Sequence, residues 1–225
     1  MQTMKPSKLY DWGVEHRHPI FMVGLILFFI VPELFEKIFS IDIPFEILFA
    51  ILILSSMLLI QSSPSKRILT NGIVIVLVAF LFIWGNYQDS KVSDLAVYIF
   101  LFLYFSLITF FLFKDIVRSK KATGSVIIGA FSGYFMIGVI CFFIYAFLDN
   151  AYPDTINVNM ENEKGVWDMF YFSFITLTTI GYGDFSPTSS LGQKIVILQG
   201  LTGQFYLAIV LAILVGKFLS HDENE

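Results

Sequence analysis

The segment 178–184, with the sequence TTIGYGD, carries residue types that could bind a cation stripped of its water. Such an ion needs a ring of oxygen atoms in place of its hydration shell. A backbone presents successive carbonyl oxygens to one axis only if alternate residues adopt conformations that glycine tolerates and other residues resist. Gly181 and Gly183 supply this freedom at alternate positions. The carbonyl oxygens expected to face the axis are those of Thr179, Ile180, Gly181 and Tyr182. The Thr179 hydroxyl would add a further oxygen, and four chains around the axis would close the cage.

The chain as a whole has the composition of a membrane protein. Of its 225 residues, 56% are hydrophobic and only 14% are charged, and the mean hydropathy is +0.77. Soluble domains carry about 25% charged residues, and disordered chains are far less apolar. The net charge of −4 offers no basic surface of the kind that binds nucleic acid. These values exclude a soluble domain and a disordered chain, and they indicate an integral membrane protein.

Six apolar stretches are long enough to cross a bilayer as helices, which takes about 20 residues. They cover residues 19–39, 43–60, 68–84, 94–113, 125–148 and 191–219. A further apolar stretch, residues 166–177, is too short to cross and lies directly before the cation-binding segment. We therefore expect an all-α membrane protein with six transmembrane helices. Between the fifth and the sixth, residues 166–177 would form a re-entrant pore helix that leads into a filter loop.

The Lys and Arg residues predict the orientation, because cytosolic loops carry an excess of these residues. With the N-terminus inside, the inner segments hold Lys5, Lys8, Arg17, Lys66, Arg67, Lys114, Arg118, Lys120, Lys121 and Lys217. The outer segments hold only Lys37, Lys91, Lys164 and Lys194. We expect a multi-pass protein of the plasma membrane with both termini in the cytosol and no cleaved signal peptide.

Composition divides the chain into three parts. Residues 1–113 hold the first four helices, residues 114–124 are a basic stretch expected to form a cytosolic linker helix, and residues 125–225 form a pore domain. Gly129 and Gly133 have the spacing that lets helices approach closely, although chance explains it equally well. Cys141 is expected to be a buried hydrophobe. His16 and His18 fit a surface pair better than a metal site.

At residues 178–184 the sequence resembles the tetrameric potassium channel family, whose filter signature TTIGYGD matches closely. The resemblance extends over residues 123–220 and includes an outer helix, a pore helix from Trp167, the filter and an inner helix. It implies a potassium-selective channel with K+ as the bound and transported ion, and the identity of the ion rests on the resemblance alone. The implied filter consists of Thr179, Ile180, Gly181, Tyr182, Gly183 and Asp184, with K+ held by the first four. Because the chain has one such motif, the pore requires four subunits, most simply a homotetramer.

Behind the filter the sequence departs from some members of the family. Those members have a pore-helix carboxylate that braces the terminal Asp of the filter, and the matching position here is Ile175. The Tyr171 hydroxyl, one helical turn further back, could hold Asp184 instead, although a solvated Asp184 fits the spacing equally well. We assign filter support to Tyr171 and Thr178.

The inner helix contains a candidate hinge and a candidate gate. Gly203 lies where many family members have a hinge glycine, with Gly200 as its competitor and close packing against the pore helix as the alternative reason. The candidate gate residues follow at intervals of four and would face the axis if Gly203 does: Leu207, Leu211 and Val215. Four copies of such side chains can close a pore by dewetting. The same residues could instead pack between helices.

The fourth helix differs from that of the voltage-gated relatives, which carry arginines at every third position. Residues 94–113 contain no Lys or Arg, so we expect little or no voltage dependence. The alternatives are a less selective monovalent cation channel and a membrane sensor that uses the first four helices. No catalytic constellation or nucleotide loop supports an enzyme. Because only about six residues follow the last apolar stretch, we expect regulation through the membrane domain, the lipids or a separate regulatory protein.

Overall fold

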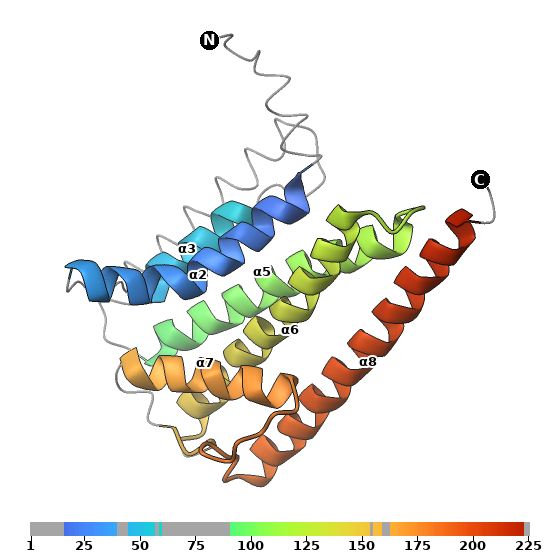
Figure 1. Ribbon diagram of the computed structural model, residues 1–225. Coiled ribbons are helices and arrows are strands. Elements are labelled where there is room, and N and C mark those ends of the chain that lie inside the picture. Colours follow the sequence, from blue (N-terminus) through green and yellow to red (C-terminus); the bar gives the residue numbers. More distant parts are fainter. Residues whose placement is uncertain are drawn as a thin grey trace.

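The structure is a computed structural model that describes residues 16–39, 45–56, 59, 91–153, 155–158 and 163–222. These ranges contain six helices (Figure 1), whose bounds are α2 (Arg17–Phe39), α3 (Phe45–Ser56), α5 (Lys91–Arg118), α6 (Gly124–Ala151), α7 (Glu163–Leu177) and α8 (Ser190–Asp222). The third expected helix, residues 68–84, lies outside the described residues.

Four of the described helices are long and apolar enough to cross a membrane. The crossing segments are Arg17–Ile38, Leu95–Arg118, Gly124–Ala151 and Ser190–Leu219, which coincide with the first, fourth, fifth and sixth expected helices. Within the second expected stretch, α3 has 12 residues. The structure therefore confirms a helical protein with several candidate membrane spans, whereas the full set of six spans stays a prediction.

The most enclosed of the four candidate spans is α6, of which 61% is buried, against 28% for the segments of α2 and α5 and 17% for that of α8. It packs against α2, α5, α7 and α8 (Figure 1). Thr123 caps its first turn by accepting a hydrogen bond from the Val126 amide at 3.4 Å. Cys141 lies in this helix and is buried, as expected. The central position of α6 makes it the scaffold for the elements around it.

Three glycines of α6 allow side chains of three other helices to approach its backbone. A Cβ atom on Gly129 would lie 3.1 Å from the His18 ring of α2, and one on Gly138 would lie 2.6 Å from the Phe174 ring of α7. A Cβ on Gly133 would overlap the Tyr206 hydroxyl of α8. Close packing is therefore the role of the Gly129 and Gly133 spacing.

An aromatic cluster joins the peripheral helices to α6 and α7. The Phe28 ring of α2 lies 5.3 Å from Phe49 of α3 and 5.2 Å from Phe170 of α7, measured between ring centroids. Phe105 of α5 stacks on Phe143 of α6 at 5.8 Å. Large buried rings of this kind contribute much of the packing free energy of a core. Helix α7 is thus held directly by α2 as well as by α6.

The linker helix expected over residues 114–124 is not a separate helix. Residues 114–118 continue α5, and residues 119–123 connect α5 to α6 without forming a helix. In the last turns of α5, the Asp115 carboxylate pairs with the Arg17 guanidinium of α2 at 3.0 Å. Lys217 of α8 donates hydrogen bonds to the carbonyl oxygens of Ile116 and Val117. The end of α5 is therefore joined to both α2 and α8.

The prediction that His18 lies on the surface was wrong, since its side chain is only 3% exposed. Its Nδ1 lies 3.0 Å from the carbonyl oxygen of Ser125, and its Nε2 lies 3.3 Å from Asp115. These partners stand about a hundred residues further along the chain, so the local sequence around His18 does not indicate them. Among the described residues no group of His, Cys, Asp and Glu side chains could hold a metal ion.

Candidate functional site

The segment directly after α7 has an alternating backbone. Thr179, Gly181 and Gly183 have φ values of 60°, 53° and 82°, and within the described ranges Thr179 is the only residue other than glycine with a positive φ. A Cβ atom on Gly181 or Gly183 would meet nothing within 4 Å. Glycine is therefore required at these positions by backbone conformation and not by lack of space.

The last turn of α7 fixes the start of this segment through backbone hydrogen bonds. The Thr178 amide donates to Phe174 O at 3.0 Å, and the Gly181 amide donates to Ile175 O at 3.1 Å. The Thr178 hydroxyl also donates to Phe174 O, at 2.8 Å. Thr178, predicted to support the filter, thus ties the segment to the pore helix.

The predicted filter residues lie together, and in a single chain they are exposed. The exposed fractions of the Ile180 and Tyr182 side chains are 55% and 72%. Neither side chain is covered by other parts of the same chain.

The Tyr171 phenol lies near the Asp184 carboxylate. Partial removal from water raises the pKa of the Tyr171 phenol, and its hydrogen bond to the Asp184 side chain and the negative charge of that carboxylate raise it further. The Tyr171 ring also contacts Phe185 edge-on at 6.1 Å. The Asp184 side chain accepts a hydrogen bond from the Phe185 amide at 3.1 Å. The contribution of this pair to filter support stays a prediction.

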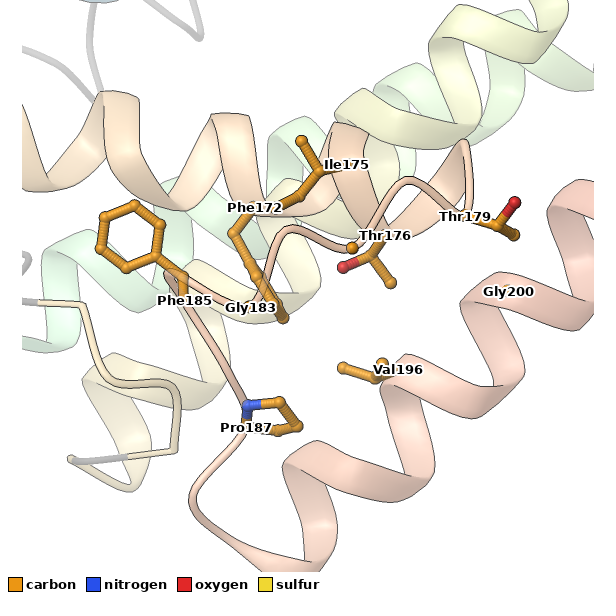
Figure 2. A pocket seen from close by; sticks show the side chains of 10 residues that line it. Phe172, Ile175, Thr176, Thr179, Gly183, Phe185, Pro187, Val196 and Gly200 are labelled. Carbon is orange, nitrogen blue, oxygen red and sulfur yellow. The ribbon is translucent and has the colours of Figure 1, made fainter.

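A pocket of about 360 Å³ lies between the filter segment, α7 and α8. Figure 2 shows its lining, which comes from four places: α7 (Phe172, Ile175, Thr176), the filter (Thr179, Gly181, Gly183), the loop after it (Phe185, Pro187) and α8 (Val196, Gly200). Ile175, whose position holds a carboxylate in some potassium channels, is only 5% exposed. The residues that line this pocket carry no ionisable group.

The loop after the filter is fastened to the loop after α6. An antiparallel bridge joins Ile156 and Pro187, and the Asn157 amide donates to Ser186 O at 3.1 Å. The Thr188 amide donates to Thr155 O at 3.0 Å. No local sequence pattern predicts this pairing, because it is an isolated bridge between two irregular loops.

The candidate hinge residue of α8 packs against α7, whereas the candidate gate residues are exposed in the single chain. A Cβ atom on Gly203 would lie 2.8 Å from Leu177 Cδ1 and 2.9 Å from Leu177 O, and α8 continues as a helix through this position. Leu207, Leu211 and Val215 are 45%, 64% and 48% exposed in the single chain. Close packing against the pore helix thus accounts for the glycine at 203, and the hinge and the gate stay predictions.

Sequence reasoning missed a polar residue of α8 that points into the core. Gln199 is 2% exposed and bonds to Ser173 of α7 and Tyr145 of α6. The available signal was its position within an apolar run, IVILQGL, because a polar side chain inside a membrane helix is expensive without a partner.

Comparison with known proteins places this site in a channel domain. Residues 127–220, which include most of α6, all of α7, the filter segment and most of α8, match the family model described as "Ion channel". No solved structure shows a significant match to the chain.

Curated relatives of the chain are potassium channels. Two-pore potassium channel 4 of Arabidopsis thaliana is 40% identical over 57 residues, which are 25% of this chain and 20% of that protein. Human potassium voltage-gated channel subfamily A member 10 is 26% identical over 95 residues, 40% of this chain and 19% of the relative. The human voltage-gated potassium channel regulatory subunit KCNF1 is 25% identical over 105 residues, 46% and 19% of the two chains.

The chain thus spans about a fifth of the length of the curated relatives that it matches. Together with the apolar helices, these likenesses show that residues 127–220 resemble the ion channel domain of potassium channels and that the chain has helices able to span a membrane.

Proposed function

We propose that the chain is one subunit of a homotetrameric, potassium-selective channel of the plasma membrane. The observation that carries this proposal is the left-handed backbone at alternate residues, Thr179, Gly181 and Gly183, directly after α7. It falls inside the stretch that matches the ion channel family.

In this proposal the filter selects K+ by replacing its water. When residues of opposite handedness alternate, successive carbonyl groups turn to the same side of the backbone. The carbonyl oxygens of residues 179–182 from four subunits would then form successive oxygen rings, with the Thr179 hydroxyls at the inner end. Ions bound at adjacent rings repel each other, which keeps them moving through the filter.

The tetramer also provides the partner that the exposed surfaces lack. Only 17% of the apolar segment of α8 is buried within the chain, and Tyr182 is 72% exposed. Four copies around one axis would cover the filter side chains and part of α8, while lipid would cover the outer helices. The inner ends of the α8 helices would then form the gate, with Leu207, Leu211 and Val215 towards the axis.

The proposed membrane placement follows from the arrangement of the helices. The chain between α6 and α8 begins and ends at the same end of the molecule (Figure 1), which fits a re-entrant α7. Arg17, Asp115 and Lys217 share the opposite end, where α5 is joined to α2 and α8. This end would face the cytosol, in agreement with the excess of basic residues there.

Potassium flux into lipid vesicles that contain the purified protein tests the proposal. We expect K+ flux. In mixed K+ and Na+, we expect a reversal potential close to the equilibrium potential of K+. Gly181→Ala should abolish selective flux, because φ of +53° is strained for any residue with a Cβ. Gly124→Ala is the matched control, since its Cβ would also meet nothing within 4 Å and its φ is not in the left-handed region.

Three results would contradict the proposal. Equal permeability to K+ and Na+ would favour the less selective cation channel, and the absence of any flux from an intact tetramer would favour a sensor. Identical flux in Gly181→Ala and wild type would remove the filter from the mechanism.

A further inference from the structure

A chain of hydrogen bonds crosses the apolar core between α6, α7 and α8. The Gln199 amide nitrogen donates to Ser173 O at 2.8 Å and to Ser173 Oγ at 3.2 Å. The Ser173 hydroxyl donates to Gly138 O at 2.7 Å. The Tyr145 hydroxyl donates to the Gln199 side-chain oxygen. Each of the three helices thus contributes to one connected network.

This network is both dry and complete. The exposed fractions of Tyr145, Ser173 and Gln199 are 0%, 0% and 2%. The oxygen and the nitrogen of the Gln199 amide both have hydrogen-bond partners, and the Ser173 hydroxyl both donates and accepts a hydrogen bond. A fully satisfied buried network specifies one arrangement of its helices, because any shift leaves a polar group unpaired in an apolar environment.

The network holds α7 close to the point where the filter begins. Ser173 stands two residues before Ile175, whose carbonyl oxygen accepts from the Gly181 amide at 3.1 Å. It stands one residue before Phe174, which bonds to Thr178. A displacement of this part of α7 would therefore move the backbone that presents the filter oxygens.

The side of α7 towards the pocket offers no comparable fastening. Ile175 is apolar there, and Gly200, the neighbour of Gln199 on α8, lines the same pocket. At Gly138 the α6 backbone approaches the Phe174 ring so closely that a Cβ would lie 2.6 Å away. In this layer the polar connection between α7 and α8 comes from Gln199, with Tyr145 holding the amide in place. Two further hydrogen bonds join α7 to α6: Ser173 Oγ donates to Gly138 O, and the Tyr134 hydroxyl donates to Leu177 O at 3.0 Å.

We propose that Gln199 is a positioning residue for the selectivity filter, which it fixes by holding α7 to α8 and α6 through Ser173 and Tyr145. The inference rests on the proposed potassium filter and adds a specific determinant of its geometry. It also makes α8 a route by which movement of the inner helix reaches the filter.

The test compares variants of the full chain in lipid vesicles. Gln199→Met keeps the length of the side chain and removes its hydrogen bonds, so we expect the K+/Na+ permeability ratio to fall about tenfold, equivalent to about 1.4 kcal/mol. We also expect currents to decay faster at low external K+ than at high external K+, because bound ions support a loosened filter. Tyr145→Phe should shift both quantities in the same direction and by less. Thr202→Val is the control, since the Thr202 hydroxyl bonds only to Leu198 O of its own helix.

Measuring the tetramer content and the thermal unfolding of each variant distinguishes an effect on filter geometry from an effect on folding or assembly. If Gln199→Met assembles and keeps the wild-type ratio and decay, the inference is overturned. If Gln199→Met fails to assemble, the Tyr145→Phe variant is used in its place. Wild-type selectivity in Tyr145→Phe would then overturn the inference. A wild-type protein that does not select K+ over Na+ overturns the proposed function and, with it, this inference.

Discussion

Thr179 shows at the scale of a single residue how a strained backbone points to function. A β-branched residue at φ 60° is a conformational outlier, and such residues cost about 1–3 kcal/mol each. Its amide donates to Thr176 O at 3.1 Å, so the end of α7 helps to hold it there. The strain is placed at the first residue of the alternating segment, which is where an oxygen cage would begin.

Tyr171→Phe tests whether a single hydroxyl stabilises the outer end of the filter. We expect this variant to lose its K+ conductance faster during sustained opening, because Asp184 loses a hydrogen-bond donor. Because its pKa is raised, the Tyr171 phenol stays protonated up to its usual pKa of about 10 and somewhat above it. It therefore remains able to donate a hydrogen bond over this pH range. The difference between variant and wild type should therefore be constant between about pH 6 and 9.

Tyr152→Phe is a suitable control for this measurement, because Tyr152 is 63% exposed beyond the end of α6. Unchanged inactivation in Tyr171→Phe would show that Asp184 is sufficiently supported by the Phe185 amide and by water.

At the scale of the helix, the glycines of α6 determine how closely its neighbours pack, because these residues have no side chain. Gly129, Gly133 and Gly138 each admit a ring from another helix, so α6 contacts α2, α8 and α7 at close range. Sequence spacing alone could not distinguish this role from chance, because the partner rings lie up to about a hundred residues away.

Gly138→Ala is expected to destabilise the pore part of the molecule. The added methyl group would lie 2.6 Å from the rigid Phe174 ring, and overpacking of this kind costs about 1–3 kcal/mol, more than the roughly 1 kcal/mol that alanine adds to helix propensity. Thermal unfolding in detergent measures the change, with Gly124→Ala as the control. The double variant Gly138→Ala/Phe174→Leu should recover part of the loss, and a stability equal to wild type in the single variant would refute the packing argument.

At the scale of the whole molecule, the charges of the peripheral helix α5 decide whether it could respond to voltage. In α5 the charged residues of the last turns, Lys114, Asp115 and Arg118, lie at one end, and residues 95–113 carry none. Each charge that crosses the field would contribute about 2.3 kcal/mol per 100 mV. A helix without such charges contributes almost nothing to voltage gating.

Single-channel recording across about 200 mV tests this expectation, because a channel without moving charges should change its open probability less than about threefold over that range. Cytosolic pH and external K+ should be held fixed during the scan. A steep rise in open probability with voltage would show that charges outside α5 move through the field.

The sequence was sufficient for the elements that a local pattern encodes. The apolar runs at 125–148 and 191–219 lie within α6 and α8, which extend a few residues further because backbone hydrogen bonding continues past the apolar segment. The positions for alternating backbone were predicted from Gly181 and Gly183, whereas the positive φ of Thr179 was not. The sequence also did not predict which distant residues pair with each other. Gln199 and Tyr145 are 54 residues apart, and neither position carries a pattern that names the other.

The short connection between α5 and α6 has a consequence for how a subunit of the proposed channel folds. Residues 119–123 can span at most about 18 Å, and α5 packs along the α6 that follows it. Each subunit can therefore complete the packing of its peripheral helices as a monomer, before it meets another copy. Folding would then be independent of protein concentration, and only the docking of finished subunits would depend on it. In a tetramer of mixed composition, a defect in one peripheral helix would remain confined to the subunit that carries it.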